Sequence, residues 1–393
     1  MKRISILLLA ATFAVPACSN DVTPTGNGDD DGTGMGTDQG KGSGSADQWD
    51  TILKGRVVDY SAALKTAALR LTGNIPTVTE INSVATATGD AQKTAYEALI
   101  TDYMSRPTFA KMALAFWRDT FKIGGTPVTD TAPVFAAQLT VKNGSYLDLF
   151  TKATANCPTF DEATGVFTDA ECANGGPKAG VLTNPAVMAS FTSNFAFRRV
   201  RWVQETFDCL RFPAEVSATP ADIGGASPYT GVWPFDSIAG ADSGGRVDFK
   251  DKSSSICANC HTTMNHIAPL FAYYDMTGTY KAGVISVTTP LDGAPLAKMS
   301  DYLPATETTA WRFGKPAADL AALGAAIAAD PDVQKCGVAR VWNWALGMTD
   351  IVDTLQDVPK ETIQAQLDAF TTGGFKMKDL IFAAFTSKDF VSY

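Results

Sequence analysis

The sequence predicts a mainly α-helical protein with long loops and little strand. Apolar residues recur at mixed three- and four-residue steps, which is the spacing of one face of a helix. Helix-start and helix-stop residues bound these segments. Alternating apolar and polar runs, which are typical of half-buried strands, are rare. The first apolar series with helical spacing is Leu53, Val57, Leu64, Ala68 and Leu71. The best strand candidate is Lys281–Thr289.

Local signals place the helices of residues 49–150. Thr77 and Glu80 have the spacing of a capping box, in which each side chain satisfies a backbone N–H at the start of a helix. Helical spacing then runs over Ala91–Met104, breaks at Arg106-Pro107 and continues until Gly124-Gly125. Aromatic residues at helical spacing around Trp117 are expected to be core rather than a cofactor site.

Further helices are expected beyond residue 150, separated by loops rich in Gly, Pro, Ser and Thr. An Asp-Pro step separates two of them, because proline is tolerated only in the first turn of a helix. The predicted helices are Ala186–Leu210, Ala317–Ala329, Val333–Leu346, Glu361–Phe370 and Met377–Phe385.

Residues 1–17 are expected to be a secretory signal peptide. Lys2 and Arg3 precede an apolar run that is too short to span a bilayer, and small residues precede Cys18. The cleavage segment resembles the lipobox of bacterial lipoproteins, which implies that Cys18 becomes an acylated N-terminus. Ser19 then favours the outer membrane, and an ordinary cleaved signal is the alternative. The Gly- and Asp-rich segment 18–48 is expected to be a flexible linker to the membrane.

Composition excludes several classes of function. The chain has 393 residues and a net charge of −9, so a nucleic acid partner is not expected. Only two histidines are present, both within residues 261–266, so no separate Ser-His-Asp site is available. No Gly-rich phosphate loop is present. Arg198, Arg199 and Arg201 form a basic cluster that is interpreted as a solvated helix face, rather than a site for a haem propionate or a lipid headgroup.

Residues 257–261 carry the chemistry. The run Cys257-Ala-Asn-Cys260-His261 is the attachment signature of c-type haem. At the start of a helix, two thiols three residues apart reach the two vinyl groups of one porphyrin edge, and the histidine that follows supplies a nitrogen to the iron. The sequence therefore predicts one covalently attached haem c.

Three other kinds of chemistry could use the Cys257–His261 run. Zinc has suitable ligands in Cys257, Cys260, His261 and His266, although adjacent Cys and His donors are awkward for one tetrahedral ion. A dithiol redox pair lacks the expected βαβ context. A plain disulfide is the simplest alternative. Export favours haem, because unmodified thiols in an oxidising compartment tend to form disulfides.

The residues after the run resemble the haem loop of class I cytochromes c. That resemblance implies that the carbonyl of Pro269 accepts a hydrogen bond from the imidazole of His261 and orients it. Met299 follows His261 in the order shown by those cytochromes, so it is the predicted sixth ligand of the iron. An open position, a water or another methionine is the alternative. Four residues are expected to wall the porphyrin or belong to the core: Phe271, Tyr273, Tyr274 and Met276.

Four cysteines remain once Cys18 and the haem thiols are assigned. In an oxidising compartment this even number suggests two disulfides. The preferred pairing is Cys157–Cys172, which closes a local loop, together with Cys209–Cys336. The sequence leaves the other two pairings open.

Several segments together resemble the planctomycete-type cytochrome c surface proteins, a family of large exported proteins that also occurs in myxobacteria. The resemblance covers much of residues 60–390, and it implies export and haem rather than a reaction. The sequence departs from the family at His266, where an Asp-Pro-like turn is usual. The similar segments are Leu69–Glu80, Gly180–Pro185 with Arg198–Cys209, Cys257–Tyr280, Cys336–Gly347 and Asp379–Phe390.

These observations predict a monohaem c-type cytochrome lipoprotein that carries single electrons at the bacterial outer membrane. Its partners would be a redox protein or a surface electron acceptor, and the membrane through the lipid anchor. The alternatives are a haem-dependent oxidase or peroxidase and a surface scaffold with structural haem or zinc. The expected divisions are 1–17 (signal peptide), 18–48 (linker), 49–150 (helical), 151–250 (disulfide-containing), 251–330 (class I cytochrome c-like haem domain) and 331–393 (C-terminal helical region).

Overall fold

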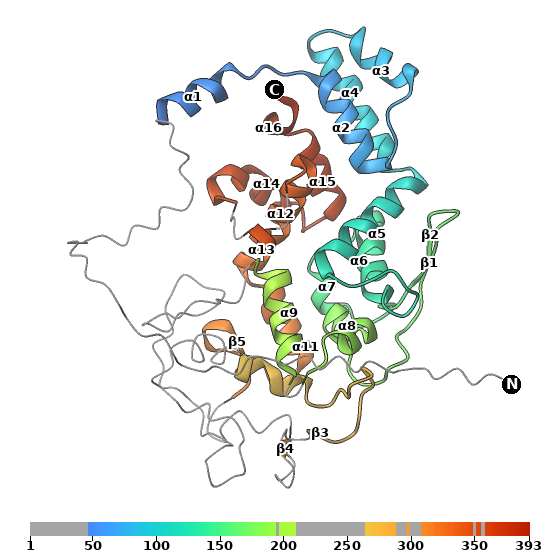
Figure 1. Cartoon of the computed structure of the whole chain (residues 1–393), viewed down its shortest axis with the longest axis vertical. Coiled ribbons are helices and arrows are strands. Elements are labelled where there is room, and N and C mark those ends of the chain that lie inside the picture. Colours follow the sequence, from blue (N-terminus) through green and yellow to red (C-terminus); the bar gives the residue numbers. More distant parts are fainter. Residues whose placement is uncertain are drawn as a thin grey trace, which may run out of the picture. The chain divides into compact units, whose positions relative to one another are not determined.

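A computed structural model describes residues 46–193, 196–209, 264–287, 297–298, 308–348, 351–354 and 358–393. The described part is mainly helical with little sheet, which confirms the predicted class (Figure 1). Helix α1 (Ala46–Gly55) belongs to a first unit, and the second unit runs from Arg56 to Tyr393. Helices from all the later segments share one buried cluster in this second unit. The predicted divisions within it stay a prediction.

The second unit begins by pairing with its own C-terminus. The amide of Val57 donates to the carbonyl of Tyr393, and the amide of Tyr393 donates back to Val57, both at 2.9 Å. The helical spacing of Leu53, Val57 and Leu64 predicted helix in this stretch, and helix is present before and after residues 56–59. Leu53 and Val57 are more than half exposed, and a new helix starts after Asp59, whose carboxylate accepts from the amide of Ala62.

Three short helices follow and pack on one another: α2 (Tyr60–Thr72), α3 (Val78–Ala85) and α4 (Asp90–Tyr103). The capping box is present as predicted. The Thr77 hydroxyl accepts from the amide of Glu80 at 3.3 Å, and a Glu80 carboxylate oxygen accepts from the amide of Thr77 at 2.6 Å. These bonds satisfy donors that the first turn of α3 would otherwise leave unpaired.

Helices α5 (Pro107–Phe121) and α6 (Thr131–Val141) pack along each other in the centre of the unit. Trp117 of α5 is a core residue, as predicted; it is 2% exposed and donates from Nε1 to the Thr140 hydroxyl at 2.8 Å. Sequence analysis did not predict α6. Every residue from 132 to 140 is buried, so the helix has no polar face and shows no helical period in its sequence.

The predicted helix 186–210 is two helices, α8 (Pro185–Ser190) and α9 (Phe197–Phe207). Ala196, immediately before α9, has a φ of 59°. A helix cannot pass through this left-handed conformation, so the two segments are separate and point in different directions.

The C-terminal helices agree closely with the sequence. Helix α12 begins at Pro331 behind the N-cap Asp330, and α15 has the predicted bounds. The helices of this region are α11 (Leu320–Ala328), α12 (Pro331–Leu346), α13 (Ile351–Thr354), α14 (Lys360–Thr372), α15 (Met377–Phe385) and α16 (Lys388–Val391). The 3₁₀ helix η1 (Gly180–Thr183) and helix α7 (Asp148–Thr151) lie against α11. Gly324 of α11 is needed there, because a Cβ would lie 2.2 Å from the carbonyl oxygen of Phe150.

Strands in the described part form three short antiparallel pairs. Of the predicted strand Lys281–Thr289, residues 281–287 are described and contain two strand residues, Ser286 and Val287, paired with Ala297–Lys298; residues 288–289 lie outside the described part. The pairs are β1 (Thr159–Asp161) with β2 (Val166–Thr168), β3 (Ser286–Val287) with β4 (Ala297–Lys298), and β5 (Ala310–Trp311) with β6 (Lys315–Pro316).

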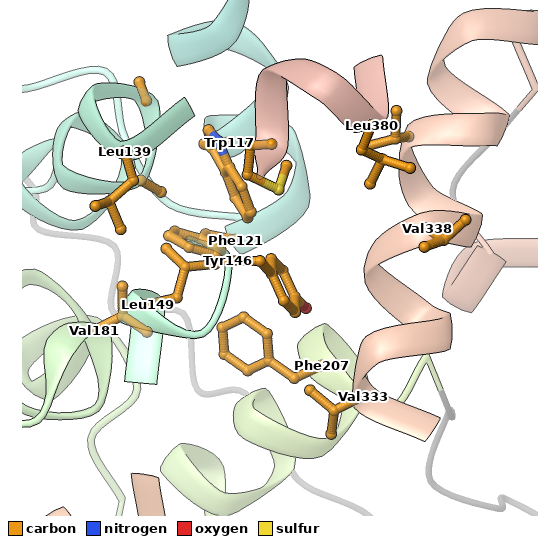
Figure 2. Packing of buried hydrophobic residues seen from close by; sticks show 14 of the residues in the cluster. Trp117, Phe121, Leu139, Tyr146, Leu149, Val181, Phe207, Val333, Val338 and Leu380 are labelled. Atoms are coloured by element: carbon orange, nitrogen blue, oxygen red, sulfur yellow. The ribbon is translucent and has the colours of Figure 1, made fainter. Parts of the chain in front are cut away.

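Aromatic side chains from distant segments meet in the core (Figure 2). Phe121 of α5 contacts Phe207 of α9 edge-on, with ring centroids 5.9 Å apart, and Phe207 contacts Phe150 at 4.7 Å. Val333 and Val338 of α12 and Leu380 of α15 close the cluster. Burial of these side chains holds α9 between the N-terminal and C-terminal helices, and α9 in turn contacts the segment that follows the haem signature.

Candidate functional site

The described residues include only the C-terminal flank of the predicted haem site. Cys257, Cys260, His261, Met299 and the lipidation residue Cys18 lie outside them. The chain is described again from Met264, three residues after His261, and a helical turn over residues 264–267 leads into the 3₁₀ helix η4 (Ala268–Phe271). We call residues 264–287 the haem flank.

The haem flank is anchored by its own apolar side chains. Ile267, Phe271 and Tyr274 are fully buried, whereas Tyr273 and Met276 are 37% and 61% exposed. Two of the four residues expected to wall a porphyrin are therefore core residues, and two face solvent. His266 is half-buried.

Pro269 occupies the first turn of η4, where the missing N–H costs nothing. Its carbonyl oxygen accepts from the amide of Ala272 at 3.1 Å. A carbonyl oxygen has two lone pairs, so this bond leaves room for the imidazole donor that the sequence predicts. The expected role of Pro269 toward His261 stays a prediction.

Arg199 of α9 contacts the haem flank from a buried position, and its predicted place on a solvated helix face is wrong. Its side chain is 1% exposed. The guanidinium donates to the carbonyls of Tyr274 at 3.0 Å and Asp275 at 2.8 Å, and twice to the carbonyl of Met188, at 2.7 and 3.1 Å. Arg198 and Arg201 are exposed, as predicted.

Burial lowers the pKa of Arg199 to about 10, because desolvation disfavours the charged guanidinium. The side chain is still charged at neutral pH. It therefore presents a buried cation to several main-chain carbonyls at once, an arrangement for which the five donors of a planar guanidinium are suited. Arg199 holds the end of α8 and the turn after η4 together.

Asp275 closes the turn that Arg199 anchors. Its Oδ1 accepts from the Thr277 hydroxyl at 2.7 Å and from the amides of Thr277 and Thr279, and Lys281 lies 3.0 Å from Oδ2. Burial acts to raise the pKa of Asp275, but these donors outweigh it and hold the pKa well below its ordinary value. The carboxylate is therefore ionised whenever the protein is folded near neutral pH.

A second anchor joins the haem flank to the disulfide-containing region. Asn174 donates from Nδ2 to the carbonyls of Thr183 and Gly278, each at 3.0 Å. The main-chain carbonyl of Asn174 accepts from the amide of Tyr280. Gly278 has a φ of 78°, and a Cβ there would lie 2.9 Å from the carbonyl oxygen of Pro185. Glycine is required because the two backbones approach so closely.

Both expected disulfides are present. Cys157 pairs with Cys172 across 15 residues, and Cys209 pairs with Cys336 across 127 residues. The first stabilises the loop that carries Asn174. The second joins the end of α9 to α12.

A buried ionic cluster next to Cys209 was not predicted. Arg312, in the 3₁₀ turn η5 (Arg312–Gly314), donates to Asp208 at 2.9 Å and lies 3.3 Å from Asp330. Asp330 also accepts from Trp311 Nε1 at 2.8 Å, and Asp332 contacts the same guanidinium. Asp208 and Asp330 have side-chain exposures of 0% and 2%. The cluster joins α9, the β5–β6 turn and the start of α12. The Asp330-Pro331-Asp332 sequence gives no sign of it beyond a helix start.

Desolvation raises the pKa of Asp208 to about 8, even though the neighbouring Arg312 acts to lower it. The folded protein thus retains a proton that the unfolded chain releases near the ordinary value of 3.8. The resulting stabilisation is complete below about pH 4 and is lost as the pH rises toward 8.

We therefore expect the free energy of unfolding to decline with rising pH less steeply in Asp208→Asn than in the native protein. The asparagine oxygen still accepts from Arg312 but no longer titrates, so the slopes should differ by up to roughly 1.4 kcal/mol per pH unit. Urea unfolding between about pH 5 and about pH 7 measures this difference. Equal slopes in the two proteins would contradict the assignment.

Among the described residues, no group of three or more His, Cys, Asp or Glu side chains is arranged to hold a metal ion. No helix in the described part combines the length and apolar composition needed to cross a membrane. Comparison of the chain with protein-family models, curated proteins and solved structures found no match.

Proposed function

We propose that this chain is a monohaem c-type cytochrome that carries single electrons, tethered to the bacterial outer membrane by lipid on Cys18. Residues 251–330 would form a class I cytochrome c-like haem domain. The observation that carries the proposal is the Cys257-Ala-Asn-Cys260-His261 run, which has the residue types and spacing required to attach and ligate one haem.

The pairing of the other cysteines supports this role. Cys157, Cys172, Cys209 and Cys336 bond to one another in two disulfides, so none of them is a partner of Cys257 or Cys260. The donor set of two thiols and an adjacent imidazole therefore fits a haem c.

The construction of the haem flank also supports the proposal. A residue that ligates iron needs a fixed position, because its orientation sets the strength of the bond. Arg199 and Asn174 fix the chain on the C-terminal side of His261 through hydrogen bonds to Tyr274, Asp275 and Gly278. These bonds fix the haem flank, which follows His261 in the chain, to the core.

In this proposal each residue has a separate role. Cys257 and Cys260 would form the thioethers, and His261 and Met299 would ligate the iron. Pro269 would orient the His261 imidazole, and Phe271 and Tyr274 would wall the porphyrin. The haem would supply one-electron chemistry, with a potential that depends on its ligands and on burial. The partner is a redox protein or a surface electron acceptor.

A pyridine haemochrome assay combined with intact-mass measurement tests the proposal. Protein from a host competent for cytochrome maturation should show one haem c and the mass of one covalent haem plus acyl chains. The double variant Cys257→Ala/Cys260→Ala should lose the covalent haem, and Cys18→Ala should lose only the acyl chains. Colourless native protein with both thiols unmodified or bridged would refute the cytochrome.

Replacement of Met299 by alanine is expected to convert low-spin iron to high-spin iron. Loss of the thioether leaves the sixth position to water or to no ligand, and either gives a weaker ligand field. The visible spectrum and the rate of carbon monoxide binding measure the change, with Met276→Ala as the control because Met276 is exposed. An unchanged spectrum in Met299→Ala would show that another residue is the ligand, and rapid carbon monoxide binding by the native protein would favour a haem enzyme.

A further inference from the structure

A cavity of about 210 Å³ lies beside α9, on the side that carries Arg198, Arg201 and Trp202. Helix α5 contributes Thr120, and α12 contributes Arg340. The haem flank does not line it, and none of the roles described above uses it. We call it the α9 cavity.

Positive charge is concentrated around this cavity. The described lining residues include four cations, which are Lys122, Arg198, Arg201 and Arg340, and one carboxylate, which is Glu205. The whole chain has a net charge of −9. Cations gathered around a concave site raise the local concentration of anions, and the low-dielectric wall strengthens the effect.

Two of the lining arginines are held in place by hydrogen bonds to residues of α9. Arg340 is 8% exposed and donates to the carbonyls of Glu205 at 2.9 Å and Thr206 at 3.0 Å. Arg201 donates to the Glu205 carboxylate at 2.9 Å. Pre-positioned guanidinium groups favour binding because little side-chain entropy is lost when a ligand arrives.

Two aromatic rings line one side of the cavity. Phe191 and Trp202 stack with ring centroids 5.3 Å apart and an angle of 23° between their planes. Trp202 is fixed by a hydrogen bond from Nε1 to the carbonyl of Phe121 at 3.0 Å. Stacked aromatic walls favour a planar apolar group in the ligand.

The α9 cavity is large enough for one aromatic ring. A cavity of roughly 150 Å³ accommodates benzene, so a cavity of about 210 Å³ that opens to solvent has space for a six-membered ring with one or two substituents.

We propose that the α9 cavity binds a small aromatic carboxylate, with its ring against Phe191 and Trp202 and its carboxylate facing Arg198 and Arg201. Guanidinium and carboxylate groups form paired charge-assisted hydrogen bonds, which gives the site its preference for an acid over a neutral ring. The proposal is independent of haem and holds whether or not the protein is a cytochrome.

Isothermal titration of the full chain with benzoate and with benzamide tests the charge requirement. The two probes have the same ring and similar size, but only benzoate is an anion. We expect benzoate to bind at least about tenfold more tightly than benzamide, and to bind more weakly as salt is raised. Equal affinities, or no benzoate binding up to about 10 mM, would overturn the proposal.

Variants then test the location. Arg198→Gln/Arg201→Gln changes two exposed side chains and should weaken benzoate binding about tenfold or more without lowering thermal stability. The matched control is Arg70→Gln. Arg70 lines a neighbouring cavity of about 280 Å³, which shares the lining residues Thr120 and Arg340 with the α9 cavity. Benzoate affinity should be unchanged in the control. Loss of binding in Arg70→Gln with retention in the double variant would place the anion in the neighbouring cavity and refute the proposed site.

Discussion

Replacement of Arg199 by methionine is expected to destabilise the protein by about 3–5 kcal/mol, because three main-chain carbonyls lose hydrogen bonds from a charged donor. Methionine fills much of the same volume but leaves the carbonyls of Met188, Tyr274 and Asp275 without the guanidinium donors. Each buried carbonyl that loses its donor costs about 1–3 kcal/mol. Urea unfolding measures the loss.

Two comparisons make the Arg199 experiment specific. Arg198→Met removes an exposed arginine from the same helix and should change stability by less than about 0.5 kcal/mol. Hydrogen exchange should show faster exchange at the amides of Gly278 and Tyr280 in Arg199→Met, because their turn loses its anchor. A cost below about 1 kcal/mol, with protection unchanged at those amides, would show that Arg199 does not hold the haem flank.

Removal of the Cys209–Cys336 disulfide should have the second large effect. In the chain-entropy model, a cross-link across about 100 residues stabilises by about 4.7 kcal/mol and one across about 15 residues by about 3 kcal/mol. Cys209 and Cys336 are 127 residues apart, whereas Cys157 and Cys172 are 15 apart. The double variant Cys209→Ala/Cys336→Ala should therefore lose more stability than Cys157→Ala/Cys172→Ala.

Urea unfolding of both double variants, under identical oxidising conditions, measures which variant loses more stability. The long cross-link also holds the end of α9, next to the Asp208–Arg312 pair, so its loss should disturb that buried cluster as well. An equal or larger loss in Cys157→Ala/Cys172→Ala would contradict the expectation. Peptide mapping without reductant confirms which cysteines are paired in the native protein.

Buried charge has two different uses in this fold. Arg199 binds main-chain carbonyls and positions a loop, whereas Arg312 binds aspartate side chains and joins three elements. The exposed arginines of α9 serve neither purpose, and they line the cavity for which we propose an anionic ligand. One helix thus supplies core packing, the anchor of the haem flank and a cationic wall.

The sequence by itself determined the helical class, several helix ends and the haem signature. These features depend on residues that are close in the chain. Thr77 and Glu80 cap a helix from three residues apart, and Asp330-Pro331 separates two helices at one step. Met377–Phe385 is a helix with the predicted bounds because its apolar residues follow a helical period. The haem signature likewise spans only five residues.

Only the tertiary structure decided the features that depend on distant partners. Helix α6 is buried on all sides, so its sequence has no period to detect, and the helix expected over 186–210 breaks at Ala196. Arg199 was placed on a solvated face because an arginine at helical spacing usually faces water, but its carbonyl partners at Tyr274 and Asp275 lie more than 70 residues away. The choice among the three cysteine pairings, and the meeting of Asp208 with Arg312, have the same cause. A local sequence pattern indicates which face of a segment can be buried. Packing of the whole chain determines which residues that face contacts.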